Sequence, residues 1–315
     1  MKKIAFLVNR TINHWEKVVQ QIEDAFAEYD KAFYHTEFAG HLIQLASEVI
    51  SEGFQNIIVV GGDGSINEAL NGILSAHQEG DNNQPDSYNW EKLQKICIGI
   101  IPAGTGNDFS KTIGITGDIR QLEQLVRKDS KQLIDIGLAS YQNRAGQPES
   151  RFFINITDVG MGGKVVEGLD VRNRLFSRSF IYNMAIARTF LTYKKSAVRC
   201  YNNDFSWEGK VMNLIVANGK YFGSGLGIAP LAEINDGKFA LVILGDISLW
   251  DYISHLGQVK ACKVLQHPEV SYRAADEVTI TSTDGRTLPI DMDGEFIGYA
   301  PMTVVNLSQR LHFFM

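Results

Sequence analysis

Cysteine is scarce in this 315-residue sequence, which contains only three. Cys97, Cys200 and Cys262 lie far apart, and no C-x-x-C spacing occurs. We therefore expect neither a disulfide framework nor a cysteine-based zinc site, and we predict reduced thiols, as in a cytosolic protein.

Long apolar runs are also absent. The first one, residues 4–8, ends at Asn9 and is too short for a signal peptide, and no run reaches the length that spans a bilayer. Basic residues are not in excess either, since 30 Lys and Arg face 36 Asp and Glu, for a net charge of −6. That balance argues against a general nucleic-acid binder. We expect a soluble, cytoplasmic protein that could still contact a membrane surface.

The length suggests two domains, and the pattern of the sequence changes near residue 135. Residues 1–135 alternate between strand-like and helix-like segments, which predicts an α/β domain with a parallel sheet and helices on both faces. Residues 136–307 predict a mainly-β sandwich or barrel, and residues 308–315 could complete the first domain. The segments that carry the β prediction are short, β-branched and separated by turn residues: 151–157, 211–217, 239–244, 277–283 and 302–307.

The most informative segment is a glycine-rich turn at residues 61–65, Gly-Gly-Asp-Gly-Ser. An apolar, strand-like run precedes it, and apolar residues at helical spacing follow it from Ile66. A strand, a glycine turn and a helix start form a place where backbone N–H groups can converge on phosphate oxygens. Glycine allows the main chain to approach that closely.

A second segment of the same kind, residues 98–109, runs from a buried-looking strand into Ala-Gly-Thr-Gly-Asn-Asp. Ligands of an open parallel sheet lie beyond the carboxyl ends of its strands, so both loops are expected to face one pocket. Asp63 and Asp108 would both be available there for a cation. Neither loop fits the P-loop or the Rossmann pattern, and a single such loop could be a plain strand-to-helix connection.

Residues 168–197 interrupt the β pattern with a basic, apolar insert. Between residues 171 and 197 there are six Arg and Lys and no Asp or Glu. We expect one or two amphipathic helices, which could bind anionic lipid headgroups at a membrane surface. The alternative, which the pattern favours slightly, is a helix that covers the open end of the β-domain with a solvated basic rim, and the two interpretations do not exclude each other.

With both loops taken together, the chain resembles the diacylglycerol-kinase-type lipid kinases, which include bacterial soluble diacylglycerol kinases and sphingosine kinases. Two further segments, 229–237 and 291–295, match in the family's order. The resemblance implies an N-terminal nucleotide-binding α/β domain, a C-terminal β-sandwich and a cleft between them. It also implies an ATP- and Mg²⁺-dependent kinase that phosphorylates a hydroxyl of diacylglycerol or a similar lipid in phospholipid metabolism.

The resemblance assigns roles to individual residues. Asp63 and Asp108 would position Mg²⁺ on the phosphates, and Glu295 would accept the proton of the lipid hydroxyl, with Asp293 beside it. In some members of the family a second, structural Mg²⁺ binds a loop like residues 233–238. The loop would offer the side chain of Asp236 and the backbone carbonyls of Glu233 and Lys238, although Asn-Asp-Gly is also a common turn. The implied ATP contacts are Asn9, Thr36, Gly61, Gly62, Asp63, Gly64, Ser65, Ile66, Asn67, Thr105 and Asn107.

Two alternatives remain open. A soluble-substrate kinase similar to NAD kinases is disfavoured by residues 104–109 and by the basic apolar insert. A non-catalytic, nucleotide-regulated lipid-binding protein is disfavoured by the pair Asp293 and Glu295, since a binder needs no base; alone, however, Asp293-Gly294 is a common hairpin signal. The sequence leaves open which lipid is phosphorylated and whether the protein is a homodimer.

Overall fold

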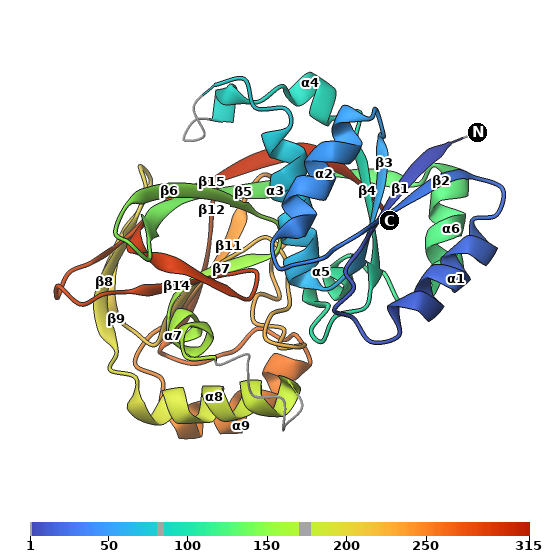
Figure 1. Cartoon of the computed structure of the whole chain (residues 1–315). Coiled ribbons are helices and arrows are strands. Elements are labelled where there is room, and N and C mark those ends of the chain that lie inside the picture. Colours follow the sequence, from blue (N-terminus) through green and yellow to red (C-terminus); the bar gives the residue numbers. More distant parts are fainter. Residues whose placement is uncertain (1, 81–84, 170–177) are drawn as a thin grey trace. The chain divides into compact units, whose positions relative to one another are not determined.

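The computed structural model describes residues 2–80, 85–169 and 178–315, and the chain divides into two compact units (Figure 1). Unit 1 contains residues 1–136 and 307–315, and unit 2 contains residues 137–306. Two strands run from one unit into the other, β5 (Lys131–Asn143) and β15 (Glu295–Phe314). Part of the predicted basic insert, with Arg172 and Arg174, lies outside the described residues.

Unit 1 is built on a parallel sheet, because the helix after each strand returns the chain to the start of the next. The strand order is β2 (Asp30–His35), β1 (Lys3–Val8), β3 (Asn56–Gly61), β4 (Cys97–Pro102) and the end of β15. Strands β1, β3 and β4 are buried along almost their whole length. This is the burial expected of parallel strands that are covered on both faces.

Helices cover both faces of this sheet (Figure 1). On one face, α1 (Trp15–Ala25) and α6 (Ile119–Lys128) bury Ile22, Leu122 and Val126 against the strands. On the other face, α2 (His41–Ser51) packs against α3 (Asp63–Ser75). The remaining helical segments of unit 1 are short: η1 (Pro85–Ser87), α4 (Trp90–Leu93) and α5 (Asp108–Thr112).

Unit 2 is mainly antiparallel. From β15, one run of paired strands continues through β14, β7, β10 and β11 to β12, a second through β13 and β8 to β9, and a third through β5 to β6. Apolar side chains from these strands form one large core, including Phe153, Phe239 and Val278. The strands are β6 (Pro148–Phe153), β7 (Ile156–Gly160), β8 (Ser196–Tyr201), β9 (Ser206–Val211), β10 (Asn213–Ala217), β11 (Phe239–Leu244), β12 (Val270–Ala275), β13 (Glu277–Ser282) and β14 (Pro289–Met292).

In the part of unit 2 that the structure describes there are three helices: α7 (Met161–Glu167), α8 (Arg178–Thr192) and α9 (Leu249–Lys260). A second apolar cluster, which includes Ile215, Val242 and Val259, joins β10 and β11 to α9. Among the described residues, no helix is both long and apolar enough to cross a bilayer. The predicted combination of an α/β unit with a mainly-β unit is confirmed.

The segment predicted as a single strand, residues 151–157, is in fact two strands. β6 ends at Phe153 and β7 begins at Ile156, with Ile154 and Asn155 between them. The break has a physical reason, because the N–H groups of Ile154 and Asn155 bond to a buried carboxylate instead of a neighbouring strand. Helix α9 was not predicted.

Candidate active-site residues

The N-terminus of α3 follows β3 after one residue, Gly62. The first bond of the helix runs from the N–H of Ile66 to the carbonyl of Gly62, at 3.1 Å. The N–H groups of Asp63, Gly64 and Ser65 therefore have no intrahelical acceptor. Three such groups at the positive end of a helix dipole can bind phosphate oxygens.

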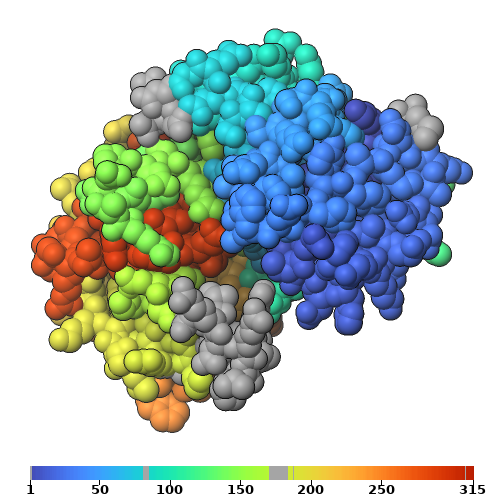
Figure 2. All heavy atoms as spheres, in the orientation of Figure 1, coloured from blue at the N-terminus to red at the C-terminus, as the bar shows by residue number. Residues whose placement is uncertain are grey.

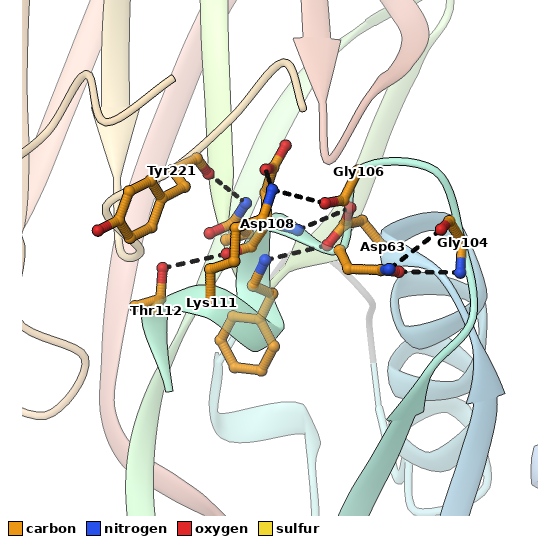
Figure 3. A network of polar contacts seen from close by, with 10 residues as sticks. Asp63, Gly104, Gly106, Asp108, Lys111, Thr112 and Tyr221 are labelled. Carbon is orange, nitrogen blue, oxygen red and sulfur yellow. Dashed lines mark hydrogen bonds and ion pairs between the residues drawn. The ribbon is translucent and has the colours of Figure 1, made fainter. Parts of the chain in front are cut away.

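The two glycine loops touch each other. A Cβ on Gly104 would lie 2.5 Å from the Cα of Gly62, and the N–H of Ala103 donates to the carbonyl of Gly61 at 2.8 Å. This contact follows from the pairing of β3 with β4, in which Gly61 lies opposite Pro102. The side chain of Asn107 accepts a hydrogen bond from the N–H of Gly104 at 2.9 Å and so fixes the second loop (Figure 3). The backbone of Asn107 has a φ of 52°.

Asp63 and Asp108 lie beside the same loop. Asp63 accepts from the N–H groups of Asp108 and Phe109, at 3.1 and 3.0 Å, and thus holds the start of α5 (Figure 3). A Cβ on Gly106 would lie 3.0 Å from Oδ2 of Asp63 and 3.2 Å from Oδ2 of Asp108. Burial raises the pKa of Asp63, and the nearby Asp108 adds to the rise, while the two N–H groups oppose it. Glycine therefore keeps open a space that two carboxylate oxygens border.

These residues fit a magnesium ion in part. Among the residues that the structure describes, no three His, Cys, Asp or Glu side chains group closely enough to hold a metal by themselves. Mg²⁺, however, is usually bound by one or two carboxylates and completes its shell with phosphate oxygens and water. Asp63 and Asp108 could supply such a pair.

A lysine that sequence reasoning missed lies next to this pair. Lys111 donates to Oδ1 of Asp108 at 3.0 Å and to the carbonyl of Gly106 at 2.8 Å (Figure 3). The i, i+3 spacing of Asp108 and Lys111 on a helix is a signal that could have found the contact. Lys111 adds positive charge where phosphate oxygens would lie.

Other predicted ATP contacts lie at the same ends of the strands. Asn9 donates to the Ser65 hydroxyl at 2.8 Å, and Thr36 accepts from the N–H of Arg10 at 3.0 Å. Thr105 is exposed, whereas the side chain of Ile66 is 1% exposed and packs in the core. Asn67 is also buried and bonds to Asn71 at 3.2 Å. Ile66 and Asn67 thus help to position the helix, while Asn9 and Ser65 link two loops.

In unit 2, the Asp293 carboxylate is held by the backbone. It accepts from the N–H groups of Ile154, Asn155 and Ile156 at 3.1, 3.1 and 3.0 Å, and Asp293 has a φ of 48°. A buried carboxylate with three such donors fixes the conformation of its own turn. Its position suits the support of Glu295 better than the acceptance of a proton.

Glu295, at the start of β15, forms an ion pair with Arg151 on β6, with 2.9 Å between Oε2 and Nη2. The Glu295 side chain is 40% exposed and that of Arg151 20%. A partly exposed carboxylate can reach a substrate, and the guanidinium fixes its orientation. Sequence reasoning missed Arg151, because nothing in the spacing connects residues 144 positions apart (295 − 151).

Two more carboxyls lie behind this turn. Asp158 on β7 and Asp291 on β14 face each other as cross-strand neighbours, with exposures of 1% and 6%. Asp158 accepts from the N–H of Gly163 at 3.2 Å, and Asp291 from that of Gly294 at 2.9 Å. Burial raises the pKa of both, and for Asp291 the charge of Asp158 raises it further. The raised pKa values favour the protonated forms of both carboxyls. The bond from Gly294 to Asp291 supports the turn before Glu295.

Unit 2 also contains an apolar pocket between the sheet and its helices. Phe190 of α8, Tyr252 of α9 and Val165 of α7 contribute to its lining. Its few polar lining residues are Asn213, Asp251, His255 and His267. Asn213 also bonds to Asp158 through its side chain, so the pocket reaches the strands that carry the buried carboxyl pair.

The loop predicted to hold a structural Mg²⁺ forms a tight turn. Asp236 accepts from the N–H of Lys238 at 2.9 Å, and Glu233, Asp236 and Lys238 are exposed. The turn alone accounts for this bond, and the second metal stays a prediction.

Comparison with known proteins identifies the family of the chain. A model described as the diacylglycerol kinase catalytic domain matches residues 3–139, and one described as the YegS C-terminal NAD kinase beta sandwich-like domain matches residues 157–315. A diacylglycerol kinase of Bacillus subtilis (strain 168) is 27% identical over 325 residues, covering 100% of this chain and 97% of that protein. One from Staphylococcus carnosus (strain TM300) is 25% identical over 285 residues, covering 90% and 84%.

The fold is shared with solved structures. A crystal structure of a diacylglycerol kinase from Bacillus anthracis str. Sterne superimposes with a TM-score of 0.69 at 18% identity, covering 99% of this chain and 96% of that one. Both units of the chain are thus accounted for by known relatives. The chain belongs to the diacylglycerol kinase family, with a diacylglycerol kinase catalytic domain followed by a YegS-type C-terminal domain.

Proposed function

We propose that this protein is an ATP- and Mg²⁺-dependent lipid kinase that transfers the γ-phosphate to a hydroxyl of diacylglycerol or a similar lipid. The observation that carries the proposal is the meeting of the two glycine loops beside Asp63 and Asp108. There, two carboxylate oxygens border the space that Gly106 leaves open. Helix α3 starts at Asp63, and its first three N–H groups lack an intrahelical acceptor. Phosphate oxygens and a hard cation fit that combination of donors and acceptors.

The apolar pocket of unit 2 supports a lipid as the phosphate acceptor. Its lining, with Phe190, Tyr252 and Val165 among it, suits acyl chains rather than a soluble nucleotide such as NAD. It also lies in the unit that carries Glu295. This favours the lipid kinase over the soluble-substrate alternative.

In the proposed transfer each residue has a separate task. The N–H groups at the start of α3, with Lys111, would bind phosphate oxygens, and bound Mg²⁺ would neutralise charge on the transferred group. Glu295 would accept the proton of the lipid hydroxyl. Its ion pair with Arg151 would orient the Glu295 carboxylate, and Asp293, which accepts three backbone hydrogen bonds, would fix the turn before it. Catalysis of this kind depends mostly on positioning and charge neutralisation.

A transfer assay tests the proposal. The purified protein is incubated with γ-labelled ATP and Mg²⁺ and with a panel of acceptors: diacylglycerol, monoacylglycerol, sphingosine and NAD. We expect label in the lipid fraction and none in NAD. Label in NAD alone would support the soluble-substrate kinase, and nucleotide binding without any transfer would support a non-catalytic lipid-binding protein.

A further inference from the structure

Helices α8 and α9 expose large apolar side chains. On α8, Met184 is 52% and Leu191 75% exposed, and on α9, Trp250 is 79% and Ile253 50% exposed. Single exposed apolar residues are ordinary, but a group of them on adjoining elements marks an interaction site. We call these four side chains the α8/α9 apolar surface.

The four side chains lie on the outer faces of the two helices. Met184 and Leu191 are seven residues apart and Trp250 and Ile253 three apart, so each pair shares one face of its helix. The inner faces meet through Phe190 and Tyr252, whose ring centroids are 4.8 Å apart, and both rings line the apolar pocket. In Figure 2, α8 (yellow) and part of α9 (orange) form the surface at the lower edge of the view.

Cations outnumber acids on and next to these two helices. The exposed cations near α8 are Arg188, which lies on the helix, and Lys194, which follows it. Those near α9 are Lys260, its last residue, and Lys263, which follows it. Residues 178–192 contain no acid. The acid of α9, Asp251, bonds to Ser248 at the N-cap and lines the pocket. Asp246, near the start of α9, is paired with Lys195.

We propose that the α8/α9 apolar surface docks on an anionic lipid bilayer. A tryptophan and aliphatic side chains among lysines and arginines match the boundary between headgroups and acyl chains, where apolar burial and attraction to phosphates act together. The inference extends the proposed function, because the same two helices cover the apolar pocket. Phe190 and Tyr252 of these two helices line that pocket.

Vesicle sedimentation tests the docking without ATP, and hence independently of kinase activity. Equimolar phosphatidylglycerol and phosphatidylcholine vesicles are compared with pure phosphatidylcholine vesicles. We expect binding to the anionic vesicles that weakens about tenfold or more in the Trp250→Ser, Ile253→Ser double variant. Phe38→Ser is the matched control, because Phe38 is 54% exposed but belongs to unit 1, and it should bind like the wild type.

The charge contribution is tested separately. Lys260→Glu with Lys263→Glu should weaken binding to the anionic vesicles by about tenfold or more and leave the weak binding to phosphatidylcholine unchanged. Added salt should reduce the difference, since screening acts on exposed charges. Equal binding of the wild type and both double variants would overturn the proposal.

Two further measurements separate the outcomes. If the surface instead joins two copies of this chain, the Trp250→Ser, Ile253→Ser variant changes the molecular mass in sedimentation analysis and leaves vesicle binding intact, which contradicts docking on lipid. If the docking proposal and the kinase proposal are both correct, the Trp250→Ser, Ile253→Ser variant loses phosphate transfer to diacylglycerol in vesicles. It keeps transfer to a short-chain, water-soluble diacylglycerol. Vesicle binding with no transfer to either substrate would preserve the docking surface and refute the kinase.

Discussion

At the scale of single residues, the carboxyls Asp158 and Asp291 have an effect that does not depend on any ligand. Both lie buried on neighbouring strands, and burial raises the pKa of Asp158 to about 7. The unfolded chain titrates near the ordinary aspartate value, so between that value and about pH 7 the folded state holds more protons. Raising the pH through this window therefore lowers the free energy of unfolding.

The corresponding prediction concerns Asp158→Asn. In the wild type the free energy of unfolding should fall by up to about 1.4 kcal/mol per pH unit for each proton that unfolding releases. The variant removes one titrating group and also the charge that raises the pKa of Asp291, so the fall should be smaller. Urea unfolding between pH 5 and pH 8 measures this, with exposed Asp204→Asn as the control. Equal slopes in wild type and Asp158→Asn would show that Asp158 does not cause the pH dependence and would contradict the prediction.

The residue scale also shows where sequence reasoning reaches its limit. Asp63 and Asp108 could be placed together because the carboxyl ends of adjacent parallel strands share one edge. Arg151 could not be placed beside Glu295, because antiparallel pairing of distant strands leaves no periodic trace in the sequence. Asp158 gave no signal either, since only the register of β7 against β14 brings it opposite Asp291.

At the scale of elements, the two glycine loops depend on a backbone contact that excludes a side chain. In Gly104→Ala, the new Cβ would meet the Cα of Gly62 at 2.5 Å and Oδ1 of Asn107 at 3.0 Å. One loop must shift, so we expect a loss of stability of about 1–3 kcal/mol and weaker ATP binding. Calorimetric titration and thermal unfolding measure both effects. Gly117→Ala is the control, because its new Cβ would meet the Pro102 carbonyl at 3.9 Å, an ordinary contact. If Gly117→Ala bound ATP as weakly as Gly104→Ala, the account would be contradicted.

Helix α9 begins with a capping box. The Ser248 hydroxyl accepts from the N–H of Asp251 at 3.2 Å, and Asp251 accepts from the N–H of Ser248 at 2.8 Å. Ser248→Ala should lower the stability of unit 2 by about 1 kcal/mol, as the loss of an N-cap usually does. Ser254→Ala removes an exposed bond within the same helix and should cost less. Denaturant unfolding compares the two, and a larger loss in Ser254→Ala would contradict the role of the cap.

The elements themselves were predictable to different degrees. Apolar residues at helical spacing from Ile66 located α3, because these side chains are buried in the core of unit 1. The strand break at Ile154 and Asn155 was not predictable, since their N–H groups bond to Asp293, a residue 138 positions or more away. Helix α9 was overlooked although Ser248 and Asp251 have the spacing of a capping box.

At the scale of the whole molecule, the chain joins an α/β unit with two adjoining glycine loops to a β unit with buried carboxyls and an apolar pocket. The family comparisons account for both units and confirm the predicted fold class. Which lipid is phosphorylated could not be predicted from the sequence, because the pocket is lined by generic apolar residues. A measurement of phosphate transfer tests the proposed lipid, metal and carboxylate roles.

The most direct measurement is a single-turnover transfer of labelled γ-phosphate from ATP to diacylglycerol by the wild type and by Glu295→Gln. The amide keeps the shape of the side chain but cannot accept a proton, so we predict transfer by the wild type and a loss of at least about 100-fold in the variant. Exposed Glu208→Gln is the matched control and should transfer like the wild type. Unchanged circular dichroism and thermal unfolding would show that the variant is folded. Near-normal transfer by folded Glu295→Gln, or no transfer by the wild type to any lipid, would contradict the account.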